Sequence, residues 1–149
     1  LLTIQNTDVA PTIAFTAPTS FNLEQSGTAS VIVRLSAVTA QTTTVTVSVS
    51  GSATAGLDYQ APSATLQIPA DTFEGTIFIP LLADELAEQD ETIVLSLSAP
   101  NSATLSSSSV HTITLTDGNV APVIANGPTP AVNPVTGTSV NLSFAATDA

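Results

Sequence analysis

The chain of 149 residues lacks cysteine, and apart from one histidine it has a single basic side chain, Arg34. Without cysteine there are no disulfides and no thiolate ligands for a metal. The formal net charge of -11 disfavours nucleic acid and anionic membranes as partners, because both are polyanions. No apolar run approaches the roughly 20 residues that a membrane-spanning helix needs. We therefore expect neither nucleic-acid binding nor membrane insertion.

Histidine and large aromatic residues are almost as scarce as basic ones, with one His, one Tyr and no Trp. His111 alone cannot supply the several ligands of a zinc site, and no partner for a catalytic triad is evident. It shares strand parity with Ile113 and Leu115, so we expect it at the rim of an apolar face. Tyr59 is expected to pack in the core. Asp84 and Glu88 could imitate a glycosidase pair, but no aromatic subsites form a sugar cleft. The sequence therefore predicts no enzyme.

Alternating apolar and polar residues fill most of the chain, with abundant Val, Ile, Leu, Ser and Thr. This pattern is typical of half-buried β-strands. Turns rich in Gly, Pro, Ser and Asp separate the segments, and Pro18 interrupts the first one. We predict an all-β fold, a seven-stranded antiparallel sandwich of two sheets with immunoglobulin-like character. The expected strands are residues 12–15 with 21–24 as one broken strand, then 29–36, 43–50, 64–68, 76–82, 92–98 and 110–116.

A short repeat marks the two ends of this set of strands. Residues 2–13 match residues 113–124, and Pro11 and Pro122 are 122 - 11 = 111 residues apart, about the length of one sandwich domain. We therefore expect residues 1–8 to be the last strand of a preceding module and residues 9–119 to form the sandwich. Residues 120–149 are expected to open a following immunoglobulin-like or cadherin-like module. The sequence thus indicates a piece of a modular array, with any export signal outside it.

The most unusual stretch is residues 81–91, which carries five carboxylates within eight residues: Asp84, Glu85, Glu88, Asp90 and Glu91. At about 5 Å and an effective dielectric near 20, each pair of like charges costs roughly 3 kcal/mol. Basic side chains cannot offset this repulsion here. A hard divalent cation, most plausibly Ca²⁺, is the candidate.

Strand direction predicts where further acids lie, because successive antiparallel strands reverse. If strand 29–36 leaves one end of the sandwich, the strands ending near residues 50, 82 and 116 return to that end. Glu24, Asp58 and Asp117 then join the five acids of residues 84–91 there, whereas Asp71 and Glu74 lie at the opposite end. The alternative is that these acids are separately solvated loop residues that keep the protein soluble.

Residues 11–117 resemble the Calx-β domain, a module of sodium/calcium exchangers, of integrin β4 and of large bacterial surface proteins. Five elements carry the resemblance in order and spacing: Ile13-Ala-Phe15, Leu23-Glu-Gln-Ser-Gly27, Gly51-Ser-Ala-Thr-Ala-Gly-Leu-Asp-Tyr59, residues 81–91 with the following strand, and Ile113-Thr-Leu-Thr-Asp117. The resemblance implies a seven-stranded sandwich whose Ca²⁺ is held by loops at one end. The direction of the predicted strands selects the same end of the sandwich.

The resemblance also implies a ligand set, carried over by position: Glu24, Asp58, Asp84, Glu88, Glu91, Asp117 and the backbone carbonyl of Leu86. This chain departs from the exchanger pattern at three places. Ala83 replaces the first Asp of the acidic loop, and Gly118 and Asn119 replace acids after Asp117. Fewer carboxylates reduce both ion number and affinity, so we expect one or two weakly bound ions.

Two functions remain open at this stage. The chain is either a calcium-binding, stiffened spacer of a large extracellular protein in adhesion, matrix or filament assembly, or an accessory ligand-binding module of an exported enzyme. The partners of a spacer are neighbouring modules or copies of the same protein. The missing aromatic platform and the modular joints favour the spacer.

Overall fold

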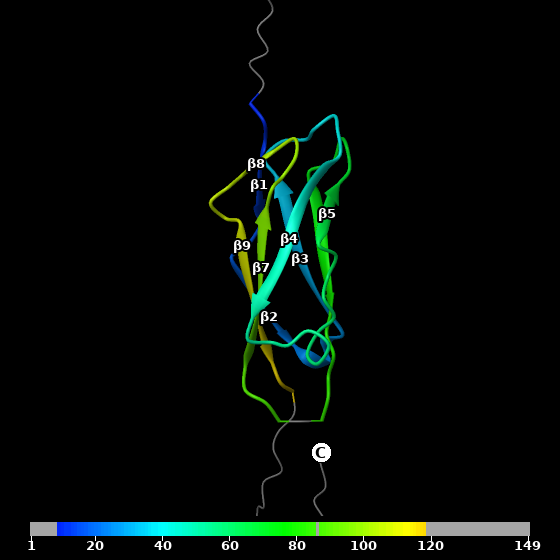
Figure 1. Ribbon diagram of the computed structural model, residues 1–149, viewed down its shortest axis with the longest axis vertical. Coiled ribbons are helices and arrows are strands. Elements are labelled where there is room, and N and C mark those ends of the chain that lie inside the picture. The colour runs from blue at the N-terminus through cyan, green and yellow to red at the C-terminus, as the bar shows by residue number, and fades with distance from the viewer. Residues whose placement is uncertain (1–8, 86, 119–149) are drawn as a thin grey trace, which may run out of the picture.

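The computed structural model describes residues 9–85 and 87–118, and these fold as a β-sandwich (Figure 1). The four-stranded sheet has the order β6-β3-β1-β8, and the five-stranded sheet has the order β2-β9-β7-β4-β5. The elements are β1 Thr12–Phe15, β2 Thr19–Leu23, the 3₁₀ helix η1 Glu24–Ser26, β3 Thr28–Leu35, β4 Thr43–Gly51, β5 Thr65–Ile68, β6 Glu74–Pro80, β7 Glu91–Ser98, β8 Thr104–Leu105 and β9 Val110–Thr116.

The core lies between the two sheets and follows from the alternation along the strands. In β3, buried and exposed residues alternate without a break, and Val33 and Leu35 are among the buried ones. In β7 and β9 the inward positions are filled by residues such as Ile93, Leu95 and Ile113, each fully buried. The apolar face of each strand thus becomes one side of the shared core. The all-β sandwich expected from the sequence is confirmed.

The first strand is divided between the two sheets. Residues before Pro18 form β1, which pairs with β3, and residues after it form β2, which pairs with β9. Both β1–β8 and β2–β9 are parallel pairs, so the sandwich is not antiparallel throughout and has nine short strands in the described residues rather than seven. The parallel pair β2–β9 has a simple cause, because both strands run toward the acidic end.

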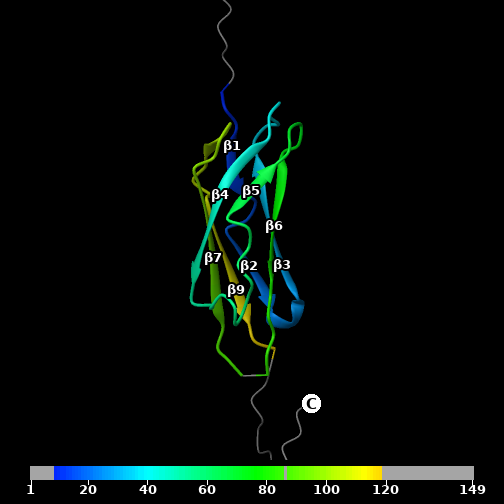
Figure 2. The same ribbon diagram turned by 45° about the vertical axis from the view of Figure 1, so that its right-hand side comes forward.

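The chain begins and ends its described part at opposite ends of the sandwich. Figures 1 and 2 show β1 starting at one end and β9 leaving at the other, with the long axis between them. We call the end where β9 finishes the acidic end; it comprises η1, residues 52–60, residues 81–85 and 87–90, and Asp117. The neighbouring modules expected over residues 1–8 and 120–149 lie outside the described residues.

Candidate metal site

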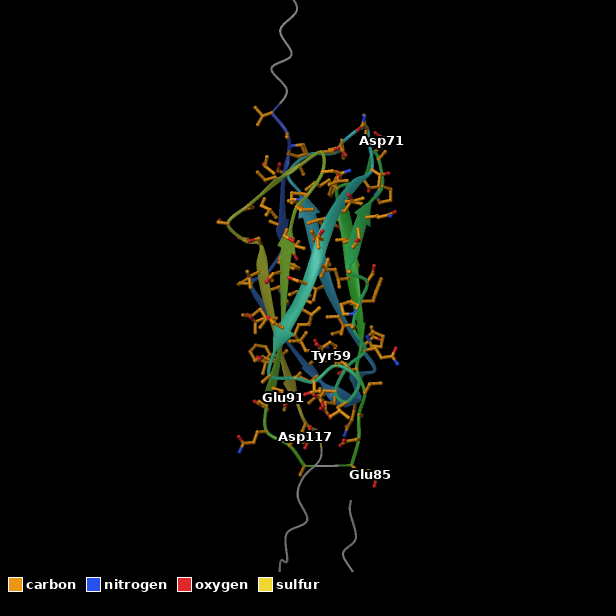
Figure 3. The ribbon with its side chains drawn as sticks, in the orientation of Figure 1. Tyr59, Asp71, Glu85, Glu91 and Asp117 are labelled. Carbon is orange, nitrogen blue, oxygen red and sulfur yellow. The ribbon has the colours of Figure 1, made fainter. Side chains whose placement is uncertain are left out.

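Three loops and one short helix bring carboxylates to the acidic end. Glu24 belongs to η1, Asp58 lies between β4 and β5, and Glu88 lies between β6 and β7. Figure 3 shows Glu85, Glu91 and Asp117 at this end and Asp71 at the other. The direction of each strand therefore places the acids as the sequence pattern predicted.

Glu24, Asp58 and Glu88 form the tightest group, with one carboxylate oxygen from each within 4.8 Å of the others. Glu24 is 5% exposed and Asp58 is 8% exposed, while Glu88 is exposed. Acids buried to this degree are uncommon unless paired or bound to a metal. Residues as far as 88 - 24 = 64 positions apart in the chain thus converge on one point.

Backbone hydrogen bonds fix Asp58 in this position. The Thr54 N–H donates to the Asp58 carboxylate, and the Asp58 N–H donates to the Thr54 carbonyl at 3.0 Å. The Leu82 N–H donates to the Asp58 carbonyl at 2.9 Å, which ties the loop after β4 to the end of β6. The following residue, Tyr59, is buried and forms a β-bridge with Leu81. Asp58 is therefore held both by its own loop and by residues 81 and 82, which follow β6.

Glu91, the first residue of β7, faces the same group. Its Oε2 atom is buried and has no hydrogen-bond partner in the described structure. Burial raises the pKa of Glu91 from 4.5 to about 6, aided by a hydrogen bond to the Asp58 carboxyl and by the charges of Asp58, Glu88 and Glu24. A buried carboxylate oxygen without a donor is costly. It is the kind of atom that a cation would satisfy.

Asp117 and Asp84 are the two further carboxylates of the predicted ligand set that lie near this group. The Glu88 N–H donates to Asp117 Oδ2 at 2.8 Å, so the residue after β9 contacts the acidic loop directly. The charge of Asp84 contributes to the raised pKa of both Glu24 and Glu88. Leu86, whose carbonyl was a predicted ligand, lies outside the described residues. Glu85 and Asp90 are exposed and stand apart from the group of Glu24, Asp58 and Glu88.

At the acidic end, the carboxylates of the described residues have no basic side chain that neutralises them. Burial and then the neighbouring carboxylates raise the pKa of Glu24, and the same causes raise that of Glu88. The single Arg34 cannot help, because its Nη2 lies 2.9 Å from Glu74 Oε1, and Glu74 pairs with it across β3 and β6. An all-oxygen donor set with excess negative charge and an orphaned oxygen fits a hard cation such as Ca²⁺.

One contact at the end of the sandwich was not predicted from the sequence. A Cβ atom on Gly118 would lie only 2.6 Å from the Gln25 side chain. Gln25 is the residue after Glu24, so η1 and the chain just after β9 lie against each other. The only clue was that both flank predicted ligands, Glu24 and Asp117.

His111 lies deeper than the expected rim position, with 3% of its surface exposed. Its Nδ1 lies 2.7 Å from the Ala17 carbonyl, which only accepts, so Nδ1 carries a proton. Its Nε2 lies 2.9 Å from Ser20 Oγ, and its ring centroid is 5.5 Å from that of Phe15. The ring thus fastens the crossover from β1 to β2 onto β9, which is a structural task.

Comparison with known proteins adds a family match. The family model of the Calx-beta domain matches residues 6–119. Among the described residues, no helix is long and apolar enough to cross a membrane. No curated protein matches the chain.

Solved structures share the fold at low sequence identity. The apo form of the Calx CBD1 domain is 21% identical with a TM-score of 0.68, over 74% of this chain and 100% of that one. The calcium binding domain CBD12 of CALX1.1 is 22% identical with a TM-score of 0.65, over 70% of this chain and 44% of that one. A putative carbohydrate binding protein from Bacteroides ovatus is 15% identical with a TM-score of 0.55, over 71% of this chain and 37% of that one. The last two of these chains are each more than twice as long as the part of them that this chain matches.

Proposed function

Because the chain belongs to the Calx-beta domain family, we propose that it is a calcium-binding module and that its acidic end holds the ion. The observation that carries the proposal is the group of Glu24, Asp58 and Glu88 oxygens within 4.8 Å. The buried, unpartnered Oε2 of Glu91 supports it. Bound Ca²⁺ would supply the positive charge that these carboxylates lack.

The ligands in this proposal are Glu24, Asp58, Glu88 and Glu91 at the centre, with Asp84 and Asp117 beside them and the Leu86 carbonyl as the predicted backbone ligand. Asp58 is pre-positioned by the Thr54 N–H, whereas Glu88 sits in an exposed loop. We therefore assign to Asp58 and Glu24 the fixed part of the site and to the acidic loop the part that closes on the ion. Ala83, Gly118 and Asn119 limit the site to one or two ions of modest affinity.

We further propose that the module is a spacer in a large extracellular protein, acting in adhesion, matrix or filament assembly with neighbouring modules or copies of itself as partners. The repeat of residues 2–13 at residues 113–124 supports this, as does the placement of the start of β1 and the end of β9 at opposite ends of the sandwich (Figure 1). An ion at Asp117 would hold the strand end from which the next module continues.

The accessory module of an exported enzyme is the second candidate. The likeness to a putative carbohydrate binding protein concerns the fold. The exposed aromatic residues of the described chain are Phe21 on the five-stranded sheet, Phe78 on the four-stranded sheet, and Phe73 just before β6. Phe21 and Phe78 lie on different sheets, and the Arg34 guanidinium covers the Phe73 ring at 4.9 Å from its centroid, so the spacer is the better supported function.

The experiment is a thermal unfolding comparison of Asp58→Asn and Asp71→Asn in Ca²⁺ and in chelator. Asn keeps an acceptor for Thr54 N–H and tolerates the positive φ of 60° at Asp71. We expect Ca²⁺ to raise the unfolding temperature of the unmodified chain and of Asp71→Asn, since a ligand at 100 times its Kd adds about 2.7 kcal/mol. Asp58→Asn should lose most of that rise. Equal rises in both variants would contradict the proposed site.

A further inference from the structure

The edge strand β2 has a free side that no other described strand covers. β2 is the outermost strand of the five-stranded sheet and pairs only with β9. The Thr112 N–H donates to the Pro18 carbonyl at 2.9 Å, and in a parallel ladder alternate residues bond to the same neighbour. Pro18, Ser20 and Asn22 therefore face β9, whereas the N–H and C=O groups of Thr19, Phe21 and Leu23 point away from it.

The side chains along this edge carry no charge, and two of the three that point away from the core are apolar. Phe21 is 76% exposed and Leu23 is 50% exposed. Exposed edges usually carry a charge, a proline or a bulge that prevents further pairing. β6, the edge of the other sheet, has Glu74 and Pro80, and β8 has only two residues. β2 has none of these protections within residues 19–23.

The edge is also held rigidly for pairing. His111 lies beneath it and bonds both Ala17 and Ser20, the residues on either side of the start of β2. Five consecutive residues of β2 keep register with β9, from Thr19 opposite Thr112 to Leu23 opposite Thr116. A partner strand would thus meet a pre-ordered edge, which lowers the entropy cost of docking.

Charge decides which partner fits. The chain carries a net charge of -11, which repels polyanions and also opposes a second copy unless the carboxylates of the two copies stay apart, and β2 offers no carboxylate to a basic peptide. A second β2 strand is equally neutral and presents the same bonding groups. Glu24 follows Leu23 directly, so two copies in parallel would bring their acidic ends together. In an antiparallel pair centred on Phe21, six residues separate the two Glu24 positions, about 20 Å at about 3.4 Å per residue. That exceeds the Debye length of about 8 Å at physiological salt.

We propose that a second copy of this chain pairs with β2 through an antiparallel β2–β2 contact centred on Phe21, joining two five-stranded sheets into one. Phe21 then faces Phe21 of the other copy, and Thr19 faces Leu23 of the other copy. By the two-fold symmetry of the contact, Leu23 likewise faces Thr19 of the other copy, which makes three opposed pairs. Each of the three pairs exchanges two backbone hydrogen bonds, and the aromatic rings meet across the strands. A five-residue contact is smaller than a standard interface of roughly 800 Å² per partner, so the single module associates weakly and an array associates through multivalency.

The test uses a single cysteine, because the full chain has none. Directly opposed residues of a hydrogen-bonded antiparallel pair have Cα atoms about 5.5 Å apart, within the range that a disulfide spans. Under mild oxidation we expect Phe21→Cys to give a disulfide-linked dimer at least ten times faster than Phe78→Cys. Phe78 is a matched control, since it is 62% exposed on the edge strand of the other sheet.

Reversible association is measured by sedimentation equilibrium on the chain without cysteine. Phe21→Lys should raise the dissociation constant of the dimer at least tenfold, and Phe78→Lys should leave it unchanged. Three results would overturn the proposal: equal oxidation rates for the two cysteine variants, faster dimer formation by Phe78→Cys, or an unmodified chain that stays monomeric up to millimolar concentration. The last would leave β2 as an edge without a partner copy.

Discussion

In the calcium-free chain, burial and then the neighbouring carboxyl groups disfavour the charged form of the Glu91 side chain, which raises its pKa. Its pKa lies near 6, and those of Glu24 and Glu88 are also raised. These groups hold protons more tightly in the folded chain than in the unfolded one, where 4.5 is the ordinary value. Folding is therefore coupled to proton uptake at this end between about pH 4.5 and 6.

The sign of this coupling gives a prediction for the calcium-free protein. Because the folded state binds more protons, the free energy of unfolding should fall as pH rises through about 4.5 to 6 and level off above that window. Glu91→Gln removes the largest contribution and should flatten the fall. The measurement is urea unfolding in chelator at half-unit steps of pH. A free energy of unfolding that rises through this window would contradict the assignment of raised pKa values.

At the element scale, the end of β4 depends on a glycine. Gly51 has φ of 128°, and a Cβ atom there would lie 2.1 Å from the Thr92 carbonyl oxygen of β7. Ala53 N–H donates to that same carbonyl at 3.0 Å. The backbones of β4 and β7 thus approach so closely that no other residue fits, just before the chain turns toward Asp58.

We predict that Gly51→Ala destabilises the chain by about 2 to 4 kcal/mol, because strained backbone and a main-chain clash add together. Gly27→Ala is the control, since Gly27 also has positive φ, 76°, but open space around its Cβ position. It should cost about 1 to 3 kcal/mol, because its φ of 76° and ψ of -35° lie in a region that residues with a Cβ rarely adopt. Denaturant midpoints at constant slope measure both. Equal losses would mean that the contact with Thr92 is relieved by a small backbone shift.

The regular strands were predictable from alternation, and the departures have local causes. Strand 110–116 was predicted with its observed bounds, and β3, β4 and β7 differ by one residue at their ends. β6 ends at Pro80 rather than residue 82 because the Pro80 carbonyl and the Leu82 N–H bond to the loop at Gln60 and Asp58. That irregular pairing depends on tertiary contacts, which alternation does not encode.

The site was predictable as a place but not as a set of contacts. Strand direction alone brings Glu24, Asp58 and Glu88 to one end. It cannot tell that Glu85 and Asp90, in the same acidic stretch, are exposed while Glu91 buries an oxygen. The difference lies in loop geometry, since Glu91 opens a paired strand and the other two lie in the loop before it. The ligand roles stay predictions.

At the scale of the whole molecule, the acidic end is also the exit. Asp117 accepts a hydrogen bond from the acidic loop, and Gly118 lies against Gln25 next to Glu24. An ion held by these residues would immobilise the chain at Asp117 and Gly118, where a following module is proposed to begin. The proposed metal site and the chain that leaves the sandwich after β9 are therefore mechanically coupled.

This coupling predicts that Ca²⁺ stiffens a tandem pair of modules. Small-angle scattering on a two-module chain should give a larger maximum dimension in Ca²⁺ than in chelator, and proteolysis near Gly118 should slow. Asp117→Asn should abolish both changes, whereas Asp71→Asn, at the opposite end (Figure 3), should not. An unchanged maximum dimension would remove the stiffening role even if the ion binds.

In the proposed site, carboxylates from four separate parts of the chain bind Ca²⁺ together. Calorimetric titration of chelator-treated protein with Ca²⁺ measures this binding. At pH 6 we expect saturable binding of one or two ions with release of protons, because Glu91 is then partly protonated. Heats that vary with the ionisation enthalpy of the buffer would reveal those protons. A flat titration up to millimolar Ca²⁺, with dilution heats only, would mean that these carboxylates form no Ca²⁺ site.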